Sequence, residues 1–193
     1  MLTLDSLASR LAALPPSCGP TRLIAVDGFA GSGKTTFAAR LSAALSPRPE
    51  GAPVVHLDDL ATHEQFFGWT DRLRSEVLEP LAAGRPVRHR VYDWTLHRFA
   101  TTRELAAAPP FLLLEGVGAG RRAVRPQLAA LVWMELDATT ARARGEDRDG
   151  PDQADFWSHW FVGQSTHFRH DPTRPFANFL VDGATGEPLG NAR

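Results

Sequence analysis

A glycine-rich stretch, VDGFAGSGKTT at residues 26–36, has the residue types and the spacing of a phosphate-binding loop. Residues 28–35 match the pattern G-x-x-x-x-G-K-[ST] in full. Glycines let a backbone wrap closely around a phosphate with its N–H groups pointing inward, and a helix that begins there turns its positive end toward the same anion. The pattern therefore predicts a nucleotide site with contacts from Gly28, Ala30, Gly31, Ser32, Gly33, Lys34, Thr35 and Thr36.

Lys34 is the only lysine among the 21 basic residues of the chain, and the others are all arginines. A lysine ammonium is a compact charge on a flexible stem, whereas a planar guanidinium does not fit inside a closed loop of backbone. We therefore expect Lys34 to reach the β- and γ-phosphates of a nucleotide and the Thr35 hydroxyl to hold magnesium. The alternative is a flexible glycine–serine turn that contains an incidental lysine.

Carboxylates follow two apolar runs of strand length. Asp58 and Asp59 come directly after PVVHL at 53–57, and Glu115 ends FLLLE at 111–115. Ligands of open α/β sheets bind at the carboxyl ends of the strands. Asp58 could there accept the proton of a hydroxyl that attacks a γ-phosphate, and Glu115 could bind magnesium or its water shell. Helix capping by Asp58 or Asp59, and a helix-dipole or ion-pair role for Glu115, are the structural alternatives.

The elements that must position these residues alternate between strands and helices. Continuous apolar runs separated by segments of helix length indicate strands that are buried on both faces of a parallel sheet. The sequence thus predicts a three-layer α/β/α fold of the P-loop NTPase type, with a five-stranded parallel sheet and a small helical lid. We expect strands at 22–27, 53–57, 111–115, 130–136 and, more weakly, 178–182. We expect helices at 34–45, 70–83, 121–129, 138–148 and 153–168, and irregular structure at 84–100.

Length and composition favour one domain with no strong overall field. A chain of 193 residues can bury one core, so we expect a single domain over 1–193, with an N-terminal helix at about 3–14, a core at about 22–182 and a lid at about 138–150. The net charge of −1 offers no general attraction for nucleic acid or anionic membranes.

Cysteine content and hydropathy indicate the compartment. Cys18 is the one cysteine, which excludes an internal disulfide framework and a multi-cysteine zinc site and fits a reducing environment. No apolar run approaches the roughly 18 residues that span a bilayer, and no basic leader begins the chain. We therefore expect a soluble, unprocessed, cytoplasmic protein.

Taken in order, these motifs resemble the uridine kinase family of P-loop kinases, near its phosphoribulokinase and pantothenate kinase branch. GRPVRHRVYDWTLHR at 84–98 looks like that family's glycine-then-tyrosine-aspartate stretch, in which a histidine follows the tyrosine by five places. LLLEG at 112–116 is similar to its acidic strand end. ELDATTARARGEDRD at 135–149 resembles the strand and arginine-bearing lid helix that close over the phosphates. The resemblance covers residues 22–182.

The resemblance implies roles for individual residues. Asp58 becomes the catalytic base, and Thr35 and Glu115 gain magnesium roles. The implied phosphate contacts are Arg144 and Arg148, and the implied acceptor contacts are Asp71, Tyr92 and His97. Trp94, beside the tyrosine-aspartate pair, could stack on a base or pack in the core.

Three departures from the family's pattern lie on the acceptor side. Leu60-Ala61 follows the two aspartates where an aromatic pair is usual, and Gly145 stands at a lid position that is often arginine. The ribose-contacting stretch is reduced to FGWTD, which leaves Asp71 as the ribose ligand. The donor chemistry is therefore better supported than uridine as the acceptor.

Other aromatic and basic residues have a simpler interpretation. Trp157, Trp160 and Phe161 fall on one helical face and are expected to pack in the core or an interface. Arg121, Arg122 and Arg125 are expected to form a solvated helix face.

The sequence as a whole predicts a kinase that uses ATP and magnesium and transfers the γ-phosphoryl group to a hydroxyl of a small molecule, with a nucleoside such as uridine or cytidine as the leading acceptor. A kinase for a sugar, a sugar acid or a pantothenate-like alcohol would share every donor-side residue. An ATP-binding regulator is the alternative from another class. No nucleic-acid or membrane partner is expected, and the oligomeric state is left open.

Overall fold

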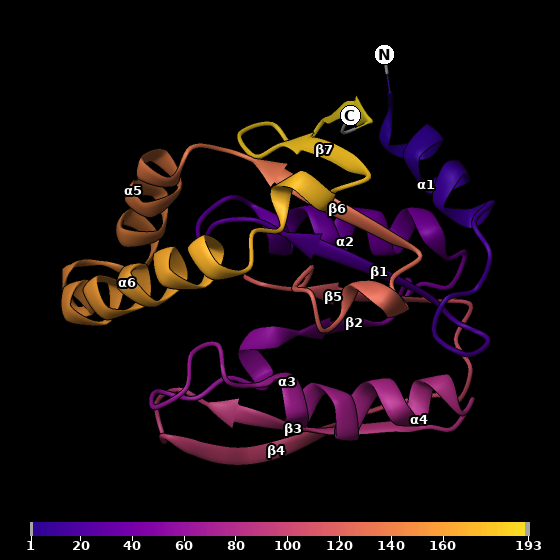
Figure 1. The fold of residues 1–193 in the computed structure, drawn as a ribbon, viewed down its shortest axis with the longest axis horizontal. Helices are drawn as coiled ribbons and strands as arrows, with labels where there is room; N and C mark the ends of the chain where they lie inside the picture. Colours follow the sequence, from indigo (N-terminus) through magenta and orange to yellow (C-terminus); the bar gives the residue numbers. More distant parts are fainter. Residues whose placement is uncertain (1, 192–193) are drawn as a thin grey trace.

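The computed structural model describes residues 2–191 and contains a mostly parallel sheet between layers of helices (Figure 1). The strand order is β2-β5-β1-β6-β7-β8. All five predicted strands are present and run parallel, which confirms the three-layer α/β/α class. Their bounds are Arg22–Asp27 (β1), Val54–His56 (β2), Phe111–Glu115 (β5), Ala130–Glu135 (β6) and Phe179–Asp182 (β7).

The central strands are buried on both faces because successive side chains point to opposite layers. In β1, Ile24 and Val26 pack against α1 (Leu4–Ala12) and α2 (Lys34–Leu45). Leu23 and Ala25 belong to a second cluster on the other face. That cluster includes apolar residues of one continuous helical segment, which consists of α3 (Thr70–Leu73), a π-helical stretch (Arg74–Leu78) and α4 (Glu79–Ala82).

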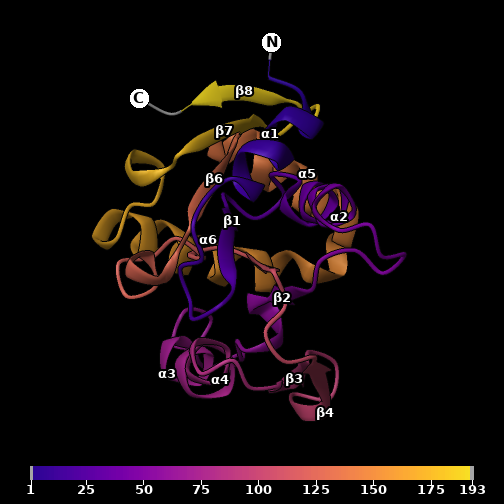
Figure 2. The same ribbon diagram turned by 90° about the vertical axis from the view of Figure 1, so that its right-hand side faces the viewer.

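Two features of the sheet structure differ from the prediction. An additional strand, β8 (Pro188–Asn191), pairs antiparallel with β7, so the sheet has six strands and not five. Residues 84–100 are not irregular, because β3 (Val87–Asp93) and β4 (Arg98–Leu105) form an antiparallel hairpin. In β3 buried and exposed residues alternate, which is typical of a half-buried strand, but the buried set includes the polar His89, and β4 is almost entirely exposed, so neither strand is a continuous apolar run. The hairpin lies at the opposite end of the molecule from α1 and β8 (Figure 2).

The helix predictions are confirmed with one exception. The predicted helices at 138–148 and 153–168 are α5 (Ala138–Asp149) and α6 (Ala154–His170). The helix expected at 121–129 is wrong, since this segment contains only a 3-10 turn at Arg125–Gln127. Arg121 is buried over the ring of Trp69, 3.6 Å from its centroid, and does not belong to a solvated face. Within residues 2–191, no helix is long and apolar enough to cross a membrane.

Candidate active site

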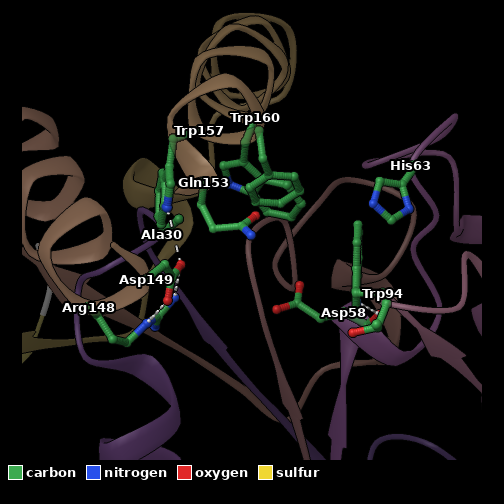
Figure 3. Close-up of a pocket in the computed structure, with 11 residues that line it drawn as sticks. Ala30, Asp58, His63, Trp94, Arg148, Asp149, Gln153, Trp157 and Trp160 are labelled. Carbon is green, nitrogen blue, oxygen red and sulfur yellow. Dashed lines mark hydrogen bonds and ion pairs between the residues drawn. The ribbon is translucent and has the colours of Figure 1, made fainter. Parts of the chain in front are cut away.

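Two cavities meet at the carboxyl ends of the central strands. One, of about 320 Å³, is bounded by the glycine-rich loop between β1 and α2, and we call it the loop cavity. The other, of about 490 Å³, is bounded by aromatic side chains of α6 and of the β3–β4 turn, and we call it the aromatic cavity (Figure 3). Ala30, Asp58, Arg148 and Trp160 line both, so the two cavities are adjacent.

The glycine-rich loop has the backbone of a phosphate site. Gly31 and Gly33 adopt φ angles of +85° and +86°, which side chains disfavour. A Cβ at Gly31 would lie 1.9 Å from the carbonyl oxygen of Ala141 in α5. Within the part of the chain that the structure describes, no side chain caps the start of α2. Its first N–H groups are therefore available to an anion, and Thr35 and Thr36 line the loop cavity at this helix end.

Lys34 lies inside this loop and is 7% exposed. Its Nζ donates a hydrogen bond to the Phe29 carbonyl oxygen at 2.9 Å. This partner is neutral, so an anion that entered the loop cavity could replace it and bind the ammonium more strongly. Two predicted contacts do not line the cavity: Gly28 is the first residue of the loop and lies outside the lining, and Ser32 is buried with an Oγ that has no hydrogen-bond partner among residues 2–191.

Asp27, which our sequence reasoning missed, fixes the entrance to the loop. Its fully buried carboxylate accepts hydrogen bonds from the backbone N–H groups of Gly28 (2.7 Å), Gly118 (2.8 Å) and Gly120 (3.0 Å). Burial raises the pKa of Asp27, and these N–H groups oppose that rise by stabilising the charge. The carboxylate thereby joins the end of β1 to the segment that follows β5. Its position at the end of the apolar RLIAVD run was the available signal.

Asp58 occupies the junction of the two cavities. Figure 3 shows its carboxylate pointing into the space between the aromatic rings of α6 and the Arg148–Asp149 pair. The carboxyl is accessible from the cavities, but protein surrounds it on the other sides. Asp58 is exposed to these cavities, but the protein around its carboxyl still removes water from it, and this desolvation, together with repulsion from Glu115, raises its pKa to about 6; the nearby Lys34 ammonium opposes the rise. The indole N–H of Trp94 donates to the Asp58 carbonyl oxygen at 3.2 Å.

Glu115 lines the loop cavity and is 5% exposed. Its Oε2 lies 2.6 Å from Nδ1 of His56, the residue that pairs with it across β2 and β5. This hydrogen bond raises the pKa of His56. His56, which was not anticipated, thus gives Glu115 the partner that the ion-pair alternative requires, and the two side chains form an ion pair when His56 is protonated.

The donor set of the loop cavity is compatible with magnesium. Within residues 2–191, no three His, Cys, Asp or Glu side chains are grouped so as to hold a metal ion by themselves. Magnesium, however, prefers oxygen ligands, keeps several waters and usually binds together with substrate phosphates. The Thr35 hydroxyl and the Glu115 carboxylate both line the cavity and supply such oxygens.

The two predicted phosphate-binding arginines lie on α5 and line the loop cavity. Arg144 donates to the Gly183 carbonyl oxygen at 2.7 Å. Arg148 forms a two-pronged ion pair with Asp149, at 2.6 and 2.9 Å, which raises the pKa of the arginine. Trp157 also donates to Asp149, at 3.1 Å. Both guanidinium groups would have to exchange these partners for phosphate oxygens.

The aromatic cavity combines ring faces with polar groups at its edge. Its rings belong to Trp94, Phe156, Trp157 and Trp160. His63, which the sequence did not single out, also lines it and stacks on His97 with 3.8 Å between ring centroids. Trp94 is partly buried and packs against the hydrophobic core, and it also lines the cavity, so the structure is compatible with both of the roles expected for it.

The remaining predicted acceptor contacts lie behind or outside the aromatic cavity. Tyr92 is buried, and its hydroxyl lies 3.0 Å from Nδ1 of His63. Tyr92 and His97 therefore support His63 and do not line the cavity themselves. Asp71, the expected ribose ligand, lines neither cavity, is 87% exposed and pairs with Arg74 at 2.9 Å. Asp71 is the last residue of the FGWTD stretch, but it lies on the solvent side of α3 and not at the site.

Gly145 has a packing role at the boundary of the aromatic cavity. A Cβ at this position would lie 2.2 Å from Cη2 of Trp157. The absence of a side chain on α5 therefore lets the Trp157 indole of α6 pack directly on the helix. Gly145, which stands where the family resemblance implies an arginine, therefore leaves the space that the Trp157 ring fills.

Comparison with known proteins identifies relatives in structure. No protein-family model matches the chain, and no curated protein matches its sequence. A possible uridine kinase from Bacillus stearothermophilus has a TM-score of 0.58 and 21% identity, with 79% of this chain and 93% of that chain covered. A putative fructose transport system kinase from Silicibacter sp. has a TM-score of 0.62 and 19% identity, with 88% and 89% covered. A D-glycerate 3-kinase from Cryptococcus neoformans has a TM-score of 0.57 and 15% identity, with 98% of each chain covered. The chain therefore shares the fold of these P-loop kinases.

Proposed function

We propose that this protein transfers the γ-phosphoryl group of ATP to a hydroxyl of a small molecule, and that a nucleoside such as uridine or cytidine is the leading acceptor. The observation that carries the proposal is the position of Asp58, which lines both the loop cavity and the aromatic cavity. Phosphates beside Lys34 and an acceptor among the aromatic rings would both face this carboxylate. Phosphoryl transfer requires such an alignment of donor, acceptor and base.

On the donor side, the loop would bind the nucleotide by charge and by backbone N–H groups. Lys34 would exchange the Phe29 carbonyl for phosphate oxygens, while the free N–H groups at the start of α2 bind the same anion. Arg144 and Arg148 would move from Gly183 and Asp149 to the phosphates and stabilise the charge that develops in the transition state. Magnesium, held by Thr35 and Glu115, would neutralise phosphate charge when bound.

On the acceptor side, Asp58 would accept the proton of the attacking hydroxyl. Its raised pKa makes it a stronger base than an ordinary aspartate, while it still ionises below neutral pH. The hydrogen bond from Trp94 to the Asp58 carbonyl oxygen holds the backbone of Asp58 beside the aromatic cavity. Asp58 would thus be a positioned base with a pKa suited to its task.

The walls of the aromatic cavity support a planar acceptor. A base could stack on the rings of Trp94, Phe156 or Trp160, which gives about 1–3 kcal/mol per stacked base. His63 and Gln153 would supply hydrogen bonds to its edge. A cavity of about 490 Å³ lies in the range of about 300–1,000 Å³ that is usual for small-molecule sites.

A kinase for another hydroxyl compound, such as a sugar, a sugar acid or a pantothenate-like alcohol, is the second candidate. It is favoured by the location of Asp71, since the expected ribose ligand lies outside both cavities. Two of the structural relatives are described as a fructose transport system kinase and a D-glycerate 3-kinase. This candidate retains every donor-side role and changes only the acceptor.

The test is magnesium-dependent ADP release from ATP against a panel of nucleosides, sugars, sugar acids and pantothenate-like alcohols. We expect stimulation by uridine or cytidine that is lost in Lys34→Ala and Asp58→Asn and kept in the exposed control Asp152→Asn. Stimulation only by a compound of another class would replace the nucleoside with that class. ATP binding without stimulation by any compound would refute the kinase proposal and favour an ATP-binding regulator.

A further inference from the structure

One peptide unit of the glycine-rich loop is held at both of its ends. The bond between Phe29 and Ala30 is trans, so its C=O and N–H groups point in opposite directions. The carbonyl oxygen of Phe29 accepts hydrogen bonds from Nζ of Lys34 at 2.9 Å and from the N–H of Ser32 at 3.0 Å. The N–H of Ala30 donates outward to Oε1 of Gln164 at 2.7 Å. The orientation of this peptide therefore depends on a residue 134 positions away in the sequence.

Gln164 is a buried residue of α6 and makes this contact from the helix face that packs against the rest of the protein. It is 3% exposed, although glutamine is a residue that is usually found at the surface. It follows Trp160 by one helical turn, on the same side of the helix. Trp160 lines both cavities, and Gln164 reaches the loop that bounds one of them. The same face of α6 thus contacts both the aromatic cavity and the glycine-rich loop.

We propose that Gln164 is a positioning residue of the phosphate site. By accepting the Ala30 N–H, it keeps the 29–30 peptide turned so that its carbonyl faces Lys34 and not the solvent. Without this contact the peptide is held only at its carbonyl end, by Ser32 and Lys34, so the carbonyl that holds Lys34 before a nucleotide arrives is less firmly oriented. The inference rests on the proposed function only in taking ATP as the ligand, and it adds a residue outside the phosphate-binding motif to the nucleotide site.

Three variants separate this role from packing. Gln164→Met keeps the length of the side chain and removes the acceptor oxygen, whereas Gln164→Glu keeps an acceptor oxygen at the same place. Thr166→Val, on the exposed side of the same helix, is the matched control. Binding of ATP and of ADP is measured by titration calorimetry. The hydrogen exchange of the Ala30 amide is measured by NMR of ¹⁵N-labelled protein.

We expect Gln164→Met to weaken nucleotide binding about tenfold, because the loss of a buried hydrogen bond removes roughly that factor. The Ala30 amide should exchange faster in the same variant. Gln164→Glu should keep this amide protected and recover part of the lost ADP affinity, and Thr166→Val should behave as the unmodified protein. A merely packing role would not produce rescue by glutamate.

Unchanged nucleotide affinity and unchanged exchange at Ala30 in folded Gln164→Met would overturn the proposal. If that variant does not fold, Gln164→Asn gives the same comparison, since it withdraws the amide oxygen from Ala30 by one methylene. None of these measurements uses an acceptor. Failure of every acceptor on the panel would therefore refute the proposed function and leave this inference standing. Unaltered nucleotide binding in folded Gln164→Met would refute this inference and leave the proposed function standing.

Discussion

The activity of this protein should rise with pH through about 6, because the proposed base, Asp58, must lose its proton before it can accept one. Burial and the neighbouring Glu115 carboxylate raise the pKa of Asp58 from 3.8 to about 6. At pH 5 a carboxyl with that pKa is about 10% ionised, whereas an unperturbed aspartate is about 94% ionised. We therefore expect the rate at pH 5 to be about a tenth of its plateau value, which is reached above pH 7.

The assay is the pH dependence of kcat/KM for the acceptor found on the panel, measured at saturating magnesium and ATP. ATP binding over the same pH range separates ionisation of the nucleotide from that of the enzyme. Asp152→Asn is the control and should leave the profile unchanged. A rate at pH 5 close to the plateau, with ATP binding intact, would show that no group with a pKa near 6 acts as the base.

Three further substitutions test separate parts of the site. Lys34→Arg should weaken ATP binding at least about tenfold in titration calorimetry, since a guanidinium does not fit inside the loop, and wild-type affinity would contradict this reason for the single lysine. Gly145→Ala should lower the free energy of unfolding by about 1–3 kcal/mol, because the added methyl group would collide with the Trp157 ring. Calorimetric unfolding should then show a Tm lower by about 2–4 °C per kcal/mol, and an unchanged Tm would argue against direct contact. Asp71→Asn should leave the acceptor KM within about twofold, given its exposed position outside both cavities. A large rise in KM would restore the ribose role that the family resemblance implied.

The features that a short stretch of chain determines for itself were predicted correctly. The glycine-rich loop lies between β1 and α2 as expected, since its glycines, Lys34 and Thr35 are contiguous. The five apolar strands were also recognisable, because strands buried on both faces need continuous apolar runs. Asp58 and Glu115 follow from the same logic, since the ends of parallel strands meet at one edge of the sheet.

The sequence was less informative where a strand is only half buried, or where a segment forms a strand only because it pairs with a neighbouring strand. The hairpin of β3 and β4 was missed because only β3 has an alternating buried face, which includes the polar His89, and β4 is almost entirely exposed. The sixth strand, β8, is short and lies at the edge of the sheet, where it depends on pairing with β7. Asp71 was placed at the site by analogy along the chain, but the orientation of α3 turns it toward the solvent.

The sequence by itself thus determined the glycine-rich loop, the parallel sheet and the carboxylates at the ends of its strands. Only the tertiary structure decided which distant residues act on them: His56 on Glu115, His63 at the aromatic cavity, and Gln164 on the Ala30 amide. The physical reason is that a motif carries its own backbone geometry. The partner of a buried polar group, by contrast, is whichever side chain the packing of another helix or strand brings within hydrogen-bond distance.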